Sequence, residues 1–120
     1  MKIVAHCILL SVAITAPAQT PSDWKITTEP QKKIMANHDT PMKVSVNDAN
    51  GRPVSDATVA LVVTMVDMDH GERKWPTRMT SPGVYEGNAN FFMVGPWTLD
   101  VLVTKGSQSK VQKTRIDVME

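Results

Sequence analysis

Hydrophobic and polar residues alternate with a period of two along most of the chain after Ala18. The clearest run spans 57–65, where every second residue from Val59 to Met65 is a large apolar one. Such alternation is typical of a β-strand with one face in a hydrophobic core. No segment after Ala18 has a sustained apolar period of 3.6 residues, so the pattern predicts strands throughout.

Further alternating runs are separated by clusters of Gly, Pro, Asn and Asp. The predicted strands besides 57–65 are 43–48, 74–80, 84–92, 97–104 and 110–118, and 24–29 with 33–35 adds a first strand or two. We expect 74–80 to be one short edge strand because it contains Pro76, and we expect Gly95-Pro96 to interrupt the chain. About seven short strands with these turns predict an all-β, immunoglobulin-like antiparallel β-sandwich. A parallel α/β fold is disfavoured because no crossover helix fits between the strands.

The first 18 residues have a different pattern from the rest. Lys2 precedes an apolar run from Ile3 to Thr15, and Ala16-Pro17-Ala18 fits the small-x-small rule for cleavage before Gln19. We therefore interpret 1–18 as a secretory signal peptide and 19–120 as the folded domain, with 19–23 as a flexible leader. The apolar run is shorter than the roughly 20 residues that cross a bilayer. The prediction is a periplasmic or secreted protein without a stable membrane span, and an uncleaved anchor is the alternative.

Composition narrows the possible functions. A chain of 120 residues with 42% hydrophobic residues allows one domain with a core. The 13 basic and 12 acidic residues leave no electrostatic signature of nucleic-acid binding. The only cysteine, Cys7, lies in the leader, so the exported domain has neither a disulfide nor a thiolate. No nucleophile–base arrangement or carboxylate pair stands out, and we expect no enzyme activity.

One group of residues has the chemistry of a metal site. Met68 and His70 are two residues apart, so both point to one side if the preceding strand continues. Met65 joins them if the chain bulges or twists there. Met93 lies just before the Gly95-Pro96 break, and such breaks gather at the ends of a sandwich. Two or three thioethers with an imidazole suit Cu(I), a soft ion.

Other roles for these residues remain open at this point. Methionine fills gaps in hydrophobic cores, which is the alternative for Met65 and Met93. Met79, just before a predicted turn, is a further candidate ligand, whereas His38 lies in a polar turn and is expected at the surface. The tryptophans are expected to be packing anchors; they are Trp24, Trp75 and Trp97.

Four separate pieces of the sequence resemble one known family. They are Val44-x-Val46-x-Asp48-x-x-Gly51-x-Pro53, Met65-x-x-Met68-x-His70, Pro82-Gly83-Val84-Tyr85-x-Gly87 and Phe91-x-Met93-x-Gly95-x-Trp97. In order and spacing, the chain resembles the YtkA-like domain family, which has FixH-like relatives, over about residues 25 to 105. Two features depart from the pattern. Val66 stands where the family often has Pro, and the short leader differs from the membrane anchor that FixH-like relatives usually keep.

The resemblance implies an immunoglobulin-like sandwich outside the cytoplasmic membrane that binds or delivers copper. It implies Met65, Met68, His70 and Met93 as ligands, and copper-handling or oxidase-assembly proteins as partners. We therefore predict an exported accessory protein that carries, sequesters or delivers Cu(I). The alternative is a periplasmic binding or structural module without metal, which docks an envelope protein complex through a sheet edge or a loop end.

Overall fold

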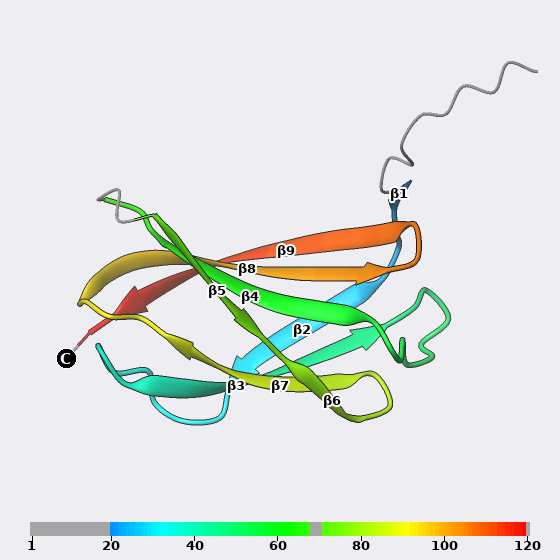
Figure 1. Ribbon diagram of the computed structural model, residues 1–120, viewed down its shortest axis with the longest axis horizontal. Helices are drawn as coiled ribbons and strands as arrows, with labels where there is room; N and C mark the ends of the chain where they lie inside the picture. The colour runs from blue at the N-terminus through cyan, green and yellow to red at the C-terminus, as the bar shows by residue number, and fades with distance from the viewer. Residues whose placement is uncertain (1–19, 68–70, 120) are drawn as a thin grey trace, which may run out of the picture.

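The computed structural model describes residues 20–67 and 71–119 (Figure 1). These residues form strands and connecting segments and contain no helix. The strands are β1 (Thr20–Pro21), β2 (Lys25–Pro30), β3 (Asp39–Asn47), β4 (Thr58–Met65), β5 (Glu72–Pro76), β6 (Arg78–Ser81), β7 (Val84–Asn90), β8 (Gly95–Lys105) and β9 (Gln108–Val118). No helix in the described part of the chain is long and apolar enough to span a membrane.

The strands are arranged in two sheets that pack face to face (Figure 1). One sheet has the order β1-β9-β8-β4-β5, and the other has the order β2-β3-β7-β6. All pairs of neighbouring strands are antiparallel except β1 and β9, which run parallel. The predicted immunoglobulin-like β-sandwich is confirmed.

The core lies between the sheets and consists of the alternating apolar residues of the long strands. In β4, Leu61 and Val63 are fully buried, as the period of two predicts. In β8, Trp97 and Leu99 are each 1% exposed, and Val101 is fully buried. Removing this much apolar surface from water supplies the main stabilisation of a chain whose only cysteine is Cys7.

Two predictions about the N-terminal part of the domain were wrong. Segment 33–35 is not a strand but part of the connection between β2 and β3. Ile34 packs against the core between the exposed residues Lys33 and Met35, so a loop reproduces the alternation of a strand. Segment 20–21, predicted as flexible leader, includes β1, which pairs with β9 at Thr20 and Gln108.

The predicted single edge strand 74–80 is two strands in different sheets. β5 pairs with β4, and β6 pairs with β7. Thr77 lies between them and fixes the crossing, since its backbone N–H and its Oγ1 both donate to the carbonyl of Val59, at 3.2 and 2.8 Å. Pro76, which lacks an N–H donor, ends β5.

Gly95 and Pro96 do not interrupt the chain but open β8. Gly95 pairs with Val118 of β9 and has a φ of 139°, a conformation that L side chains rarely adopt. The glycine therefore turns the chain sharply into the strand, and the ladder with β9 begins at that residue.

Candidate functional site

Several connections meet at the end of the sandwich where β8 begins and β9 ends (Figure 1). The backbone N–H of Asn37 donates to the carbonyl of Phe91 at 2.7 Å, which joins the β2–β3 connection to the β7–β8 connection. The N–H of Val66 donates to the carbonyl of Pro96 at 3.0 Å, which joins the end of β4 to the start of β8. Val118 pairs with Gly95, so the residue after it follows at the same end.

Methionine gathers at this end. Of the six methionines in the described part of the chain, Met42 is 1% exposed in the core and Met79 lies on β6. The other four belong to the segments that meet where β8 begins, and we call this region the methionine end. They are Met35, Met65, Met93 and Met119.

Met65 is the last residue of β4 and is 7% exposed. It pairs with Trp97, and its terminal methyl lies beside Gly95, where an added Cβ would approach that methyl to 2.9 Å. The glycine thus leaves the space that the Met65 side chain occupies. The Met65 side chain therefore extends from the core to the first residue of β8.

Met93 is presented outward from a fixed backbone. Its side chain is 38% exposed, while its carbonyl accepts a hydrogen bond of 2.9 Å from Trp97 Nε1. The Trp97 ring is itself held by Phe91 and Phe92, whose ring centroids lie 5.7 and 5.0 Å away in edge-to-face geometry. The core therefore positions the backbone at Met93, and the residue itself is exposed.

The other two predicted ligands, Met68 and His70, lie outside the described residues. The chain on either side of them is described, ending at Asp67 and resuming at Gly71. Met79, the further candidate, lies on β6, and its sulfur accepts a contact of 3.4 Å from the backbone N–H of Asp56. The turn from β6 to β7 lies at the opposite end of the sandwich, so Met79 is separated from the methionine end (Figure 1).

His38 also lies at the methionine end. It is exposed, as the sequence predicts, and it directly follows Asn37, the residue that bonds Phe91. The backbone N–H of His38 donates to the carbonyl of Met35 at 3.2 Å, which closes a turn. The sequence indicated the turn through Asn37-His38-Asp39, but gave no signal that this turn meets the loop that carries Met93.

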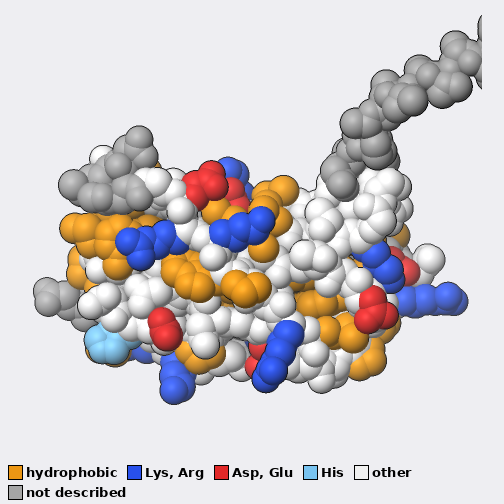
Figure 2. Space-filling view, viewed as in Figure 1, with side chains coloured by type: hydrophobic (Ala, Val, Ile, Leu, Met, Phe, Trp, Pro, Cys, Tyr) orange, Lys and Arg blue, Asp and Glu red, His pale blue; other side chains and the backbone are white. Residues whose placement is uncertain are grey.

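Exposed apolar side chains also lie at the methionine end. Val66 is 49% exposed and Val94 is 48% exposed, and Figure 2 shows hydrophobic side chains gathered at this end of the molecule. The guanidinium of Arg73 lies 4.3 Å from the ring centroid of Phe92 and covers part of that ring. Exposed valines, an arginine over an aromatic ring and exposed methionines thus lie at this end of the sandwich.

The donor chemistry of the methionine end is soft. Within 20–67 and 71–119, no group of three or more His, Cys, Asp or Glu side chains is placed to hold a metal ion. The segments that meet at this end carry the thioethers of four methionines and the imidazole of His38. Such donors fit Cu(I) and do not fit Ca²⁺ or Mg²⁺, which prefer oxygen.

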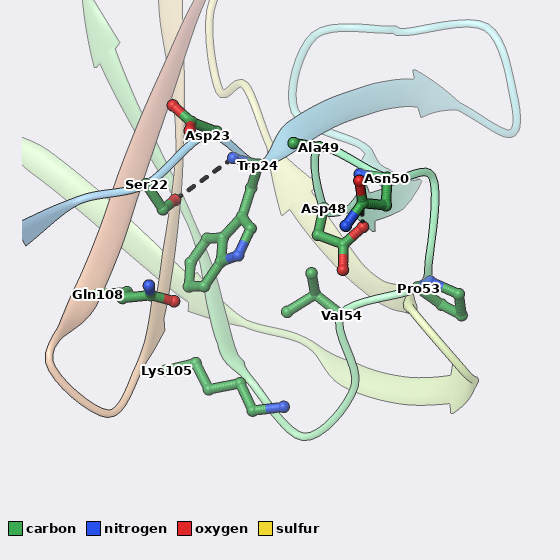
Figure 3. Close-up of a pocket in the computed structure, with 10 residues that line it drawn as sticks. All are labelled: Ser22, Asp23, Trp24, Asp48, Ala49, Asn50, Pro53, Val54, Lys105 and Gln108. Atoms are coloured by element: carbon green, nitrogen blue, oxygen red, sulfur yellow. Dashed lines mark hydrogen bonds between the residues drawn. The ribbon is translucent and has the colours of Figure 1, made fainter.

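A separate pocket of about 450 Å³ lies at the opposite end, near the β8–β9 turn (Figure 3). The indole of Trp24 points into it, and Lys105 and Asp48 lie on either side. One Asp48 oxygen already accepts the backbone N–H groups of Asn50 and Arg52, both at 2.9 Å, which stabilises the turn after β3. No methionine or histidine is among the described residues that line this pocket, so it offers no soft donor.

Known proteins resemble the chain in fold and in sequence pattern. A solved structure, the crystal structure of the Lin-41 filamin domain, matches with a TM-score of 0.57 and 19% identity, covering 88% of this chain and 98% of that chain. At that identity the likeness concerns the fold alone. A comparison with curated proteins gives no match. The model of the YtkA-like family matches residues 18–102. Because this match covers more than half of the sequence, the chain belongs to the YtkA-like family.

Proposed function

We propose that the protein is an exported accessory protein that binds copper as cargo, as Cu(I), and carries, sequesters or delivers it. The proposal involves no reaction. The observation that carries it is that Met65 at the end of β4 and Met93 in the β7–β8 connection both contact residues at the start of β8: the Met65 methyl lies beside Gly95, and the Met93 carbonyl accepts from Trp97. Both were candidate ligands on chemical grounds alone.

The proposed ligands are Met65, Met93, Met68 and His70. Met65 and Met93 are supported by their common position beside the start of β8. Met68 and His70 follow Met65 by three and five residues in the sequence, and their part in the site is proposed from the residue pattern. A thioether carries no proton that copper must displace, so methionine binds Cu(I) without a deprotonation step.

The exposure of the donors suits transfer more than permanent storage. Met93 is exposed on a fixed turn, so a partner's ligand has access to a copper ion bound there. Met65 is almost fully buried, and its side chain is flexible enough to move its sulfur toward the surface. We propose copper-handling or oxidase-assembly proteins as partners.

Copper binding is tested by titrating the full chain with Cu(I) under anaerobic conditions against a chromogenic chelator. Every sample carries Cys7→Ser, so that the only thiol does not compete. We expect Met93→Ala, Met68→Ala and His70→Ala each to weaken binding about tenfold or more. Met79→Ala is the matched control and leaves affinity unchanged, because Met79 lies on β6. Equal and weak uptake by all the variants and the parent chain would end the proposal.

Export is a separate part of the proposal with its own test. The leader 1–18 has the pattern of a signal peptide, and cleavage after Ala18 would leave Gln19 as the first residue. The mass of the protein recovered from the periplasmic fraction or the medium should match a chain that begins at Gln19. Recovery of the uncleaved chain from the membrane fraction would favour an anchor.

A second candidate function is a docking module that holds no metal. The exposure of Val66 and Val94 favours it, because exposed apolar side chains at one end of a fold can form a protein contact site. Substitution of both by Ser separates the two functions. If the parent chain binds no Cu(I) and the double substitution abolishes capture of a partner, the docking function alone is favoured. If the parent chain binds Cu(I) and the double substitution leaves that affinity unchanged, the metal site is supported.

A further inference from the structure

His38 has the features of a metal ligand although the sequence marks it only as a surface residue. Its Nδ1 lies 2.9 Å from the carbonyl oxygen of Ala36. A carbonyl only accepts, so Nδ1 carries the proton and donates it. The neutral ring then has its lone pair on Nε2, the atom that is free to bind a metal.

The turn around His38 is shaped to hold the ring in this state. Asn37 has a φ of 60°, in the left-handed region that Asn tolerates better than most residues. That conformation folds the chain back, so that the His38 N–H reaches the carbonyl of Met35 and the ring reaches the carbonyl of Ala36. Backbone carbonyls commonly orient metal-binding histidines in this way.

The turn is attached to the segment that leads to Met93. Asn37 bonds Phe91, two residues before Met93, and His38 is the next residue after Asn37. Met119 reaches the same end of the sandwich by another route. It follows Val118, which pairs with Gly95 at the start of β8, two residues after Met93. Met35, Met93 and Met119 are 42%, 38% and 68% exposed, and His38 is exposed as well.

We propose that His38 supplies an imidazole ligand, through Nε2, to Cu(I) bound at the methionine end, together with the thioethers of Met93 and Met119. This inference rests on the proposed copper function and identifies, around Met93, a donor set that draws on the β2–β3 connection and on the residue after β9. The soft ion would then be bound between three segments of the chain. An imidazole with two thioethers is a donor set that suits Cu(I).

The test compares His38→Ala with the parent chain in the Cu(I) titration, both carrying Cys7→Ser. We expect His38→Ala to weaken Cu(I) binding about tenfold or more and Met119→Ala to weaken it as well. Met79→Ala again serves as the control outside the site. Urea unfolding of His38→Ala with Cu(I) absent should have the same midpoint as the parent, because the ring is exposed and its contacts lie within one turn.

A second measurement distinguishes ligation from an indirect effect. In NMR spectra, the ring protons of His38 should shift on addition of the first equivalent of Cu(I), together with the ε-methyl groups of Met93 and Met119. If His38→Ala leaves the affinity unchanged while Met93→Ala or His70→Ala lowers it, His38 is not a ligand and the copper function stands. If the parent chain itself binds no Cu(I), both proposals fail.

Discussion

Gly83 and Gly106 both have a positive φ, of 74° and 62°, but their surroundings differ. A Cβ on Gly83 would lie 2.6 Å from Pro53 Cβ and 3.0 Å from the carbonyl oxygen of Val46. A Cβ on Gly106 would have no atom within 4 Å. The two positions therefore separate the cost of backbone conformation from the cost of a steric clash.

We predict that Gly106→Ala lowers the free energy of unfolding by about 1 kcal/mol, the cost of placing alanine at positive φ. Gly83→Ala should lose about 1–3 kcal/mol more, because the clash involves backbone and a proline ring that cannot rotate away. Urea unfolding measures both losses. Equal losses in the two variants would contradict the close packing of Gly83 against Pro53.

Tyr85 is a buried residue whose hydroxyl has two partners. It is 1% exposed, its O–H donates to the carbonyl of Val54 at 2.6 Å, and it accepts from the N–H of Ala57 at 3.1 Å. Tyr85→Phe keeps the ring but leaves these backbone groups without that partner. We predict a loss of about 1–3 kcal/mol in unfolding free energy with an unchanged denaturant slope. A loss below a few tenths of a kcal/mol would mean that water replaces the hydroxyl.

At the scale of the residue, the sequence alone predicted most of the buried core positions, because strand geometry determines which side chains share a face. A strand alternates faces, so the apolar positions of 57–65 and 97–104 were correctly assigned to the core. The same rule missed that Ala60 and Val62 on the outer face of β4 are also nearly covered, at 5% and 6% exposure. β4 lies between β5 and β8, and the local pattern does not contain these partner strands.

At the scale of the element, the two sheets are joined by side chains across an open edge. Gln112 of β9 donates from Nε2 to the carbonyl of Ile26 in β2 at 2.6 Å, and its Oε1 accepts from Thr28 Oγ1 at 3.3 Å. β2 has a ladder partner on one side only, β3. Gln112 therefore ties the edge strand of one sheet to the facing strand of the other.

We predict that Gln112→Ala speeds amide hydrogen exchange in β2 about tenfold, which corresponds to about 1.4 kcal/mol. Exchange in β4 and β8 should change less, because those strands are paired on both sides. The matched control is Gln31→Ala, since Gln31 is exposed and its amide contacts only the nearby Glu29 carbonyl at 3.4 Å. If the exchange rate in β2 is unchanged in Gln112→Ala, the hydrogen bonds of Gln112 do not stabilise β2.

The wrong predictions at this scale share one cause. The 74–80 segment alternates as one strand, yet it changes sheets at Thr77, because a crossing between sheets needs only one residue outside both ladders. Gly95-Pro96 has the composition of a turn, yet it opens a strand, because the partner β9 fixes the start of the ladder. Partner strands are not visible in a local pattern.

At the scale of the whole molecule, the methionine end exists only in the folded chain. The sequence predicted that Met93 lies at the same end as Met68 and His70, because breaks gather at the ends of a sandwich, and that Met65 joins them if the chain bulges or twists. It gave no means of adding Met35, His38 or Met119, because their proximity depends on the Asn37–Phe91 hydrogen bond and the Gly95–Val118 pair. These are long-range contacts that follow from strand register.

The central claim is that soft donors at one end of the sandwich bind Cu(I), and NMR of the methionine ε-methyl groups tests it most directly. The full chain with Cys7→Ser and ¹³C-labelled methionine methyls is titrated with one equivalent of Cu(I) under anaerobic conditions. We predict that the Met65 and Met93 methyl signals shift, while those of Met42 in the core and Met79 on β6 stay in place. Equal shifts at all the methionines, or shifts at Met79 without shifts at Met93, would contradict the account.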